Sequence, residues 1–146
     1  MSAPLLSPDS LVLDLAPADA DASLAGVAAR LAGHPDMLEF PRFVADLQAR
    51  ERLTSTALGH GIAIPHARTT SVREIVMAAG RSREGVWFES SQQNIHLIFV
   101  IGVPPHMVRE YLGVLSQLTR RLKEAGVREA LMEAASPGAF LAALNF

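Results

Sequence analysis

The feature that most constrains the fold is an apolar run in the second half of the chain. Residues 94–103, NIHLIFVIGV, carry apolar side chains at almost every position instead of every second one. Such a continuous pattern is typical of a strand that is covered on both faces and lies in the middle of its sheet. The run is too short for a membrane helix, which needs roughly 20 apolar residues. We therefore expect a buried central strand and no membrane insertion.

Segments with helical periodicity flank this strand in the sequence. Helices are expected near residues 19–33, 41–52 and 105–122, with one or two more between 126 and 144. Shorter β segments are expected at 11–15, within 55–67, and in a hairpin formed by 75–81 and 86–88. The expected fold is a single α/β domain over residues 1–146, with a mixed β-sheet flanked by helices on both faces.

Composition narrows the classes of function. The net charge of -2 and the isoelectric point near 6.2 lack the basic surplus of proteins that bind nucleic acid. The chain has no cysteine, which excludes disulfides, thiolate nucleophiles and zinc–thiolate sites. Asp9 and Asp14 interrupt the first apolar residues, and no basic segment precedes them, so we expect a cytoplasmic protein without a secretory signal.

A histidine directly behind a proline is the first candidate for chemistry. It lies in Gly59–Arg68, GHGIAIPHAR, where an apolar run leads to Pro65. Proline has a fixed φ and no backbone N–H, so we expect the strand to end there and to present His66 at the rim of the sheet. An imidazole at such a place can act as a base, a metal ligand or a nucleophile. The alternative is a surface histidine in a turn.

Arg50 is the second candidate. It shares the apolar stripe of the expected helix with Leu47, so its guanidinium is directed toward the protein body. There it can clamp a phosphate or carboxylate with two hydrogen bonds. The alternative is an arginine at a helix end that pairs with Asp46. Ser55 and Thr56 supply hydroxyl groups between the two candidates.

Residues 50–68, RERLTSTALGHGIAIPHAR, resemble the signature of one family. It is the signature of the fructose/mannitol-type enzyme IIA domains of the bacterial phosphoenolpyruvate:sugar phosphotransferase system, which include free-standing nitrogen-regulatory IIA proteins. Their motif has the shape R-E-x-x-G-S-T-G-I-G-N-G-I-A-I-P-H. The positions that agree with it are Arg50, Glu51, Ser55, Thr56, Gly59, Gly61, Ile62, Ala63, Ile64, Pro65 and His66.

The resemblance implies a phosphocarrier. In that family the histidine behind the proline is phosphorylated by phospho-HPr, the histidine phosphocarrier protein, and the arginine helps to hold the phosphoryl group. His66 and Arg50 take these positions. The recipient would be a sugar-permease IIB domain or a regulatory target protein. No cofactor is implied, and no metal is expected, because a site built from His60, His66 and His106 lacks a carboxylate ligand.

The sequence departs from the family pattern at four positions. Thr54 and Ala57 replace glycines, and His60 replaces an asparagine. The second histidine of the family, which supports the phosphohistidine, is replaced by Tyr111. Tyr111 belongs to an apolar stripe, so packing is its default role, but its hydroxyl can hydrogen-bond a phosphoryl oxygen or His66.

The remaining histidines are weaker candidates. His60 is close to the candidate nucleophile in the sequence and is a candidate to compensate for the missing imidazole. His106 precedes Tyr111 by five residues, about 140° around an ideal helix, so it is no simple substitute. His34 and His96 are expected to be satisfied structural side chains.

Two hypotheses of function follow. The first is an enzyme IIA-like phosphocarrier in which Ser55, Thr56, His60 and Tyr111 shape the phosphate pocket around His66. Because no membrane segment or fused transport domain is recognised, this hypothesis favours a nitrogen-type regulatory role or a stand-alone component of sugar uptake. The alternative is a IIA-like protein-interaction module that is not phosphorylated, which the departures from the motif favour.

Overall fold

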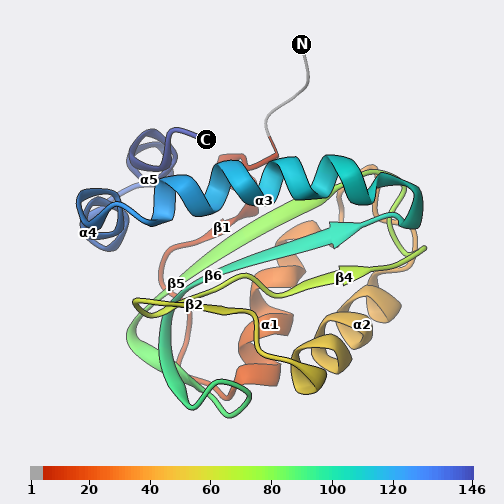
Figure 1. The fold of residues 1–146 in the computed structure, drawn as a ribbon, viewed down its shortest axis with the longest axis horizontal. Coiled ribbons are helices and arrows are strands. Elements are labelled where there is room, and N and C mark those ends of the chain that lie inside the picture. Colours follow the sequence, from red (N-terminus) through yellow and green to blue (C-terminus); the bar gives the residue numbers. More distant parts are fainter. Residues whose placement is uncertain (1–4) are drawn as a thin grey trace.

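A six-stranded mixed sheet lies between two layers of helices in the computed structural model, which describes residues 5–146 (Figure 1). The strands are β1 (Leu11–Val12), β2 (Ala57–Gly59), β3 (Ile62–Ala63), β4 (His66–Arg68), β5 (Val76–Phe88) and β6 (Gln93–Val103). The helices are α1 (Ala20–Ala28), α2 (Phe40–Leu53), α3 (Val108–Leu122), α4 (Ala125–Glu133) and α5 (Pro137–Leu144), with short 3-10 turns at Pro8–Ser10, Ala29–Leu31 and Pro105–Met107. Helices α1 and α2 cover one face, and α3, α4 and α5 cover the other. The expected fold class is confirmed.

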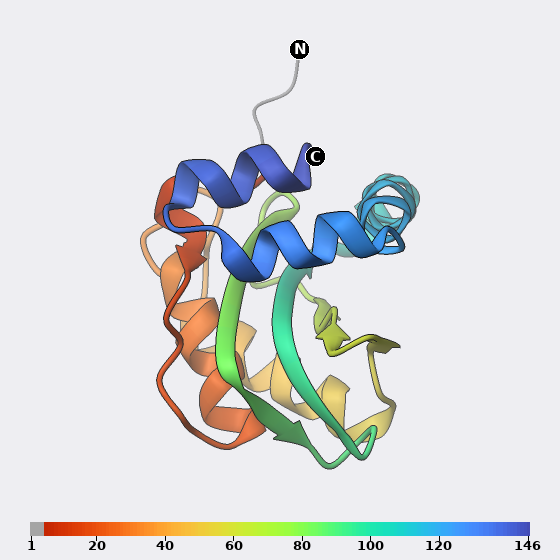
Figure 2. The same ribbon diagram turned by 90° about the vertical axis from the view of Figure 1, so that its left-hand side faces the viewer.

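The central place of the apolar run is also confirmed. Strand β6 pairs antiparallel with β5 on one side and parallel with β3 and β4 on the other. Figure 2 shows β6 running beside β5 for most of its length. Its side chains alternate between two cores: Leu97, Phe99 and Ile101 pack with α3–α5, whereas Ile98 and Val100 pack with α1 and α2. Complete burial of one such side chain contributes roughly 1.5–3 kcal/mol.

The predicted hairpin within residues 75–88 is wrong. Strand β5 runs through this segment without reversing, and both of its halves pair with β6. The register shifts between Arg81 and Val86, and Gly85 adopts a positive φ of 91°. These features mark a β-bulge, in which inserted residues bend a strand and increase its twist instead of turning it back. The hairpin is formed by β5 and β6 themselves.

The strand before His66 is expected from the sequence to end at Pro65. Strand β3 does end just before this proline, at Ala63, but pairing with β6 resumes directly after it. His66 is the first residue of β4 and pairs with Ile101 of β6. Ala63 of β3 pairs with Ile98 in the same register. The proline removes its own N–H from the ladder, but its carbonyl still accepts a hydrogen bond from the Ile101 N–H. Strands β3 and β4 therefore behave as one interrupted strand.

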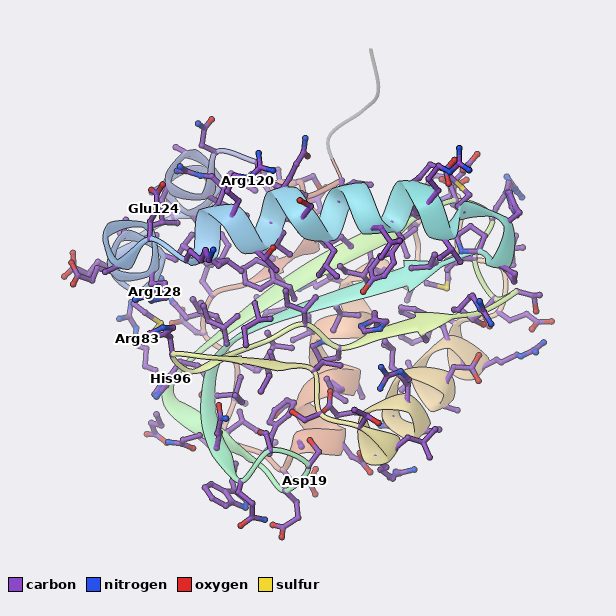
Figure 3. All side chains as sticks on the ribbon, in the orientation of Figure 1. Asp19, Arg83, His96, Arg120, Glu124 and Arg128 are labelled. Atoms are coloured by element: carbon purple, nitrogen blue, oxygen red, sulfur yellow. The ribbon has the colours of Figure 1, made fainter. Side chains whose placement is uncertain are left out.

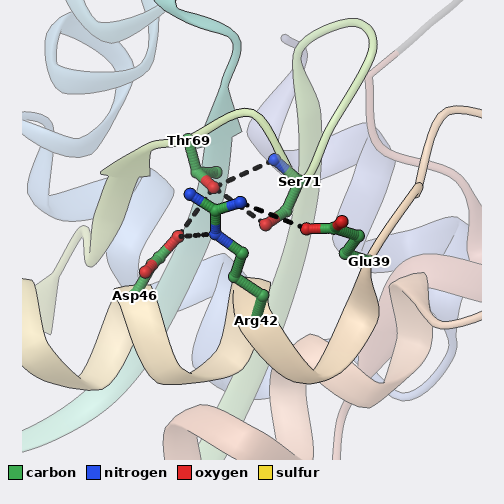
Figure 4. A network of polar contacts seen from close by, with 5 residues as sticks. All are labelled: Glu39, Arg42, Asp46, Thr69 and Ser71. Carbon is green, nitrogen blue, oxygen red and sulfur yellow. Dashed lines mark hydrogen bonds and ion pairs between the residues drawn. The ribbon is translucent and has the colours of Figure 1, made fainter.

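A polar network ties helix α2 to the end of β4 (Figure 4). The hydroxyl of Thr69, the residue after β4, donates to Asp46 Oδ2 at 2.7 Å and shares a hydrogen bond with Ser71 Oγ at 2.9 Å. Arg42 pairs with Asp46 on one side and with Glu39 on the other. These contacts fix the position of α2 relative to the strand that carries His66.

Gly102 of β6 lets α2 approach the sheet closely. A Cβ at this position would lie 2.7 Å from Phe43 Cε1 and 3.0 Å from Val76 Cγ2. Phe43 is completely buried, so its ring has no room to move aside. We expect Gly102→Ala to lower the free energy of unfolding by about 1–3 kcal/mol, the usual cost of overpacking a core. Urea unfolding followed by circular dichroism measures this change.

Gly113→Ala is the matched control for this substitution. Gly113 is exposed in α3, and an added Cβ there would have nothing within 4 Å. Alanine favours the helix more than glycine does, so this variant is expected to be more stable by up to about 1 kcal/mol. Equal changes in the two variants would contradict the close approach at Gly102.

Candidate functional site

His66 lies at the start of β4 with its imidazole half-buried. Its Nδ1 is 3.0 Å from the carbonyl oxygen of Ile64. A carbonyl can only accept, so Nδ1 carries the hydrogen and the lone pair of the neutral ring lies on Nε2. Burial lowers the pKa of His66, against the Ile64 hydrogen bond, which raises it. The charge of Arg50 lowers this pKa further, and the weaker effect of Glu51 raises it. The neutral, nucleophilic form of Nε2 is therefore favoured.

Arg50 reaches the site from the last turn of α2. Its charge acts on both His66 and Tyr111. Its Nη1 donates to the Thr54 carbonyl at 3.0 Å, and this is the guanidinium's one protein hydrogen bond within residues 5–146. The alternative pairing with Asp46 is not formed in that part of the chain, where Asp46 belongs to the network of Figure 4. The other N–H groups of Arg50 remain for a ligand.

Tyr111 lies in the first turn of α3 and contacts the ring of His66. The two ring centroids are 5.2 Å apart and the ring planes are inclined by 33°. Tyr111 packs into the core beneath α3 and is 8% exposed, so the predicted packing role is confirmed. Burial raises the pKa of its phenol, and the charge of Arg50 partly offsets this rise. The structure thus brings His66, Arg50 and Tyr111 together from three different elements.

A buried carboxylate that the sequence analysis did not place in the site supports this cluster. Glu51 is 5% exposed and accepts hydrogen bonds from the hydroxyls of Thr56 at 2.5 Å and Ser90 at 2.6 Å. The Thr56 carbonyl accepts from the Ile64 N–H at 3.1 Å, and the Ile64 carbonyl holds His66. A chain of hydrogen bonds therefore runs from α2 to the nucleophilic ring. Its sequence signal is an acidic residue in the last turn of a helix, where a negative charge opposes the helix dipole.

The hydroxyls of Ser55 and Thr56, which were expected to shape a phosphate pocket, have protein partners. Ser55 Oγ accepts a hydrogen bond from the Ala57 N–H at 3.0 Å. The Thr56 hydroxyl donates to Glu51. Both side chains therefore shape the loop between α2 and β2, and Thr56 also acts on the site through Ile64.

In the described part of the chain, the His66 ring is hydrogen-bonded to Ile64 and packed near Tyr111, and it forms neither kind of contact with His60 or His106. His60 lies at the tip of the β2–β3 hairpin with a positive φ of 56°, and it lines a hollow with Thr119 and Lys123 near the end of α3. His106 is exposed in the 3-10 turn before α3. The structure does not bring either imidazole to the place that Tyr111 occupies.

The last two histidines are hydrogen-bonded within the fold, as expected. His34 Nδ1 accepts from the Asp36 N–H at 3.0 Å, and His96 Nδ1 donates to the Ser82 carbonyl at 2.9 Å. Figure 3 shows His96 near Arg83, at the end of the sheet where β6 begins. Within residues 5–146, no three or more His, Asp or Glu side chains are grouped to hold a metal ion. No helix in the same range is long and apolar enough to cross a membrane.

A family profile covers almost the whole chain. The family described as "Phosphoenolpyruvate-dependent sugar phosphotransferase system, EIIA 2" matches residues 4–146. The chain belongs to this EIIA family. The resemblance inferred from the motif is thus confirmed, and the chain matches relatives of both the sugar-specific and the nitrogen-regulatory type.

Curated relatives of this EIIA protein represent both types. It is 41% identical over 97 residues to the fructose-specific EIIABC component of Bacillus subtilis. The aligned segment covers 66% of this chain but 15% of that protein. It is 41% identical over 91 residues to the fructose-specific EIIA component of Haloferax volcanii, covering 62% of this chain and 59% of that one. It is 36% identical over 102 residues to the nitrogen regulatory protein of Pseudomonas aeruginosa, covering 66% of each. The chain therefore spans only part of the relatives it matches.

Solved structures share the fold over nearly the full length of the EIIA chain. The nitrogen regulatory protein IIA-Ntr of Neisseria meningitidis is 33% identical, with a TM-score of 0.87 and 96% of each chain covered. The IIA mannitol protein of Escherichia coli is 25% identical, with a TM-score of 0.81, 95% of this chain and 98% of that one being covered. The IIA mannitol protein has also been solved in complex with phosphorylated enzyme IIB, again at 25% identity and with a TM-score of 0.82.

Titration of His66 tests the electrostatics of the site. Because burial and Arg50 disfavour the imidazolium, we expect a His66 pKa below the ordinary value of 6.5. Arg50→Met removes a positive neighbour and should raise this pKa, whereas Glu51→Gln removes a negative one and should lower it. NMR titration of the ring resonances measures all three values. Shifts of the same sign in the two variants would contradict the assigned geometry.

The structural role of Glu51 is tested by its amide variant. In Glu51→Gln, one of the two acceptor oxygens becomes an NH2 group, which cannot accept the hydrogen bond that the Thr56 or the Ser90 hydroxyl donated to that oxygen. We expect the free energy of unfolding to fall by about 1–3 kcal/mol. Glu129→Gln, on the exposed side of α4, is the control and should change stability by less than about 0.5 kcal/mol. Urea unfolding compares the two, and equal stabilities would refute the role of Glu51.

Proposed function

We propose that this EIIA protein is a phosphocarrier that accepts a phosphoryl group from phospho-HPr on Nε2 of His66. The observation that carries the proposal is the hydrogen bond between His66 Nδ1 and the Ile64 carbonyl, because it leaves the Nε2 lone pair available. The proposed recipient is a IIB domain of a sugar permease or a regulatory target protein. The solved complex of mannitol IIA with phosphorylated IIB supports the first recipient, and the similarity to nitrogen regulatory proteins supports the second.

The transfer step needs no proton to leave His66. Its Nε2 lone pair attacks phosphorus in line with the P–N bond of the phosphohistidine donor, and that bond breaks with its electron pair remaining on the donor imidazole. The Nδ1 hydrogen stays on the ring, where the Ile64 carbonyl accepts it. A phosphorylated ring that keeps this hydrogen carries a positive charge and is a good leaving group for the onward transfer.

Arg50 is proposed to compensate the charge of the phosphoryl group. That group brings about 1.5 to 2 negative charges into a half-buried site. A guanidinium can meet two phosphoryl oxygens at once, and most of the N–H groups of Arg50 have no protein partner in the described part of the chain. Catalysis of phosphoryl transfer consists mainly of positioning and charge stabilisation, so this small set of groups is sufficient for the chemistry.

The alternative function is a IIA-like interaction module that is not phosphorylated. The observation in its favour is Tyr111, a neutral side chain at the position of the second family histidine. Two observations favour the phosphocarrier. The first is that the hydrogen bond to Ile64 leaves the lone pair of His66 on Nε2. The second is that the charge of Arg50 acts on His66, while no acidic side chain within residues 5–146 is bonded to the Arg50 guanidinium. A binding surface alone requires neither arrangement.

Reconstitution of the relay tests the proposal. The purified protein is incubated with phosphoenolpyruvate, enzyme I and HPr from the same source, and phosphorylation is measured by intact mass. We expect one acid-labile phosphoryl group on the parent, none on His66→Ala, and parent-like labelling of His106→Ala, which alters an exposed histidine outside the cluster. Phosphorus NMR should identify the Nε2 isomer.

A IIA protein known to accept phosphate from the same HPr is the positive control. If it is labelled and the parent is not, the phosphocarrier proposal is wrong and the interaction module takes its place. Labelling of His66→Ala would also overturn the proposal, since the phosphoryl group would then be on another residue.

A further inference from the structure

The hydroxyl of Tyr111 has no hydrogen-bond partner among residues 5–146, although the residue is only 8% exposed. In that part of the chain, Ser23 Oγ is the one fully buried side-chain oxygen or nitrogen without a partner. The Tyr111 hydroxyl also lacks a hydrogen-bond partner, but it is not among these fully buried atoms. Its oxygen is therefore accessible at the surface. A hydroxyl that reaches the surface without a partner in the described part of the chain has its hydrogen available for water or for an acceptor that binds there.

The neighbours of Tyr111 identify the place where that acceptor would bind. Its ring lies 5.2 Å from the ring of His66, centroid to centroid. The charge of Arg50 is close enough to lower the pKa of both rings. A group bonded to His66 Nε2 would thus share its surroundings with a guanidinium on α2 and a phenol on α3.

We propose that Tyr111 is a catalytic residue, whose hydroxyl donates a hydrogen bond to a phosphoryl oxygen as the group arrives on His66 and while it stays there. This inference rests on the proposed function. The phosphoryl oxygens are the acceptors that fit, because His66 Nδ1 is already bonded to Ile64 and Nε2 must keep its lone pair for the attack. Arg50 and Tyr111 then both bind the phosphoryl group: Arg50 does so through its positive charge, and Tyr111 through the hydrogen bond of its neutral hydroxyl.

The proton balance of the step is simple, because Tyr111 keeps its hydrogen throughout. The new N–P bond forms from the Nε2 lone pair, and the electron pair of the broken bond remains on the donor. Burial raises the pKa of the phenol above its ordinary value near 10, and Arg50 reduces this rise only in part. Tyr111 therefore keeps its hydrogen and remains a donor near neutral pH, where the neutral ring of His66 is a nucleophile.

A phenol at this position also simplifies the pH dependence of the reaction. The titratable and charged groups that face one another here are His66, Arg50, Glu51 and Tyr111. Of the two rings in contact, only the imidazole has an ordinary pKa near neutral pH. A second imidazole would titrate near pH 6.5 and add its own transition. We therefore expect the acceptor site to contribute a single ionisation, that of His66, to the rate of phosphorylation between pH 5.5 and 8.5.

Two substitutions at position 111 test the inference. Tyr111→Phe removes the hydroxyl and retains the ring, and Tyr111→His introduces the imidazole that the family pattern has there. Initial rates of phosphorylation by phospho-HPr are measured for both variants and the parent from pH 5.5 to 8.5, and thermal unfolding confirms that each is folded. Phosphorus NMR of the phosphorylated proteins reports on the hydrogen bond itself.

Tyr111→Phe should be phosphorylated about 10- to 100-fold more slowly than the parent, the loss expected for one hydrogen bond to a charged acceptor. Its phosphorus resonance should move, because the phosphoryl oxygen has lost a donor. Tyr111→His should restore a fast rate but show a second ionisation. A folded Tyr111→Phe variant with the parent's rate and phosphorus resonance would refute the role of the hydroxyl while leaving the phosphocarrier function intact. Failure of the parent itself to accept phosphate would refute both.

Discussion

The buried carboxylate of Glu51 is the group on which the geometry of the site depends. Its oxygens accept hydrogen bonds from the hydroxyls of Thr56, in the loop after α2, and Ser90, in the turn between β5 and β6. Through Thr56 it fixes Ile64, whose carbonyl sets the tautomer of His66. A carboxylate is well suited to this place because it accepts several hydrogen bonds and donates none. A hydrogen-bond chain that begins at Glu51 therefore determines which nitrogen of the His66 imidazole keeps its lone pair.

The site is assembled from elements that each contribute a different property. The interrupted strand β3–β4 supplies the imidazole of His66, α2 supplies the positive charge of Arg50, and α3 supplies the phenol of Tyr111. The position of α2 is set by its close approach to Gly102 and by the network around Asp46, neither of which touches the reacting ring. The rigid sheet therefore holds His66, while the two helices bring their side chains to it from opposite faces.

Much of this was predictable from local sequence signals. The apolar run of β6 identified the central strand, and the motif from Arg50 to His66 singled out two side chains whose charges the structure couples. The bulge in β5 was not predictable in the same way, because a glycine with positive φ serves a turn and a bulge equally well. His60 was misleading because closeness in sequence does not imply closeness in space at the tip of a hairpin.

Replacing an imidazole by a phenol at position 111 lowers the positive charge that the cluster can offer to a phosphoryl group. Beside the positive charge of the phosphorylated ring itself, a phosphoryl group on His66 would meet the positive charge of Arg50, with the negative charge of Glu51 nearby. The hydroxyls bonded to Glu51 disperse its charge but do not cancel it. A second imidazole could add a positive charge when protonated, whereas Tyr111 offers only the dipole of its O–H group. A phosphoryl group held with less positive charge is less stabilised on the carrier, and this favours its onward transfer over its retention.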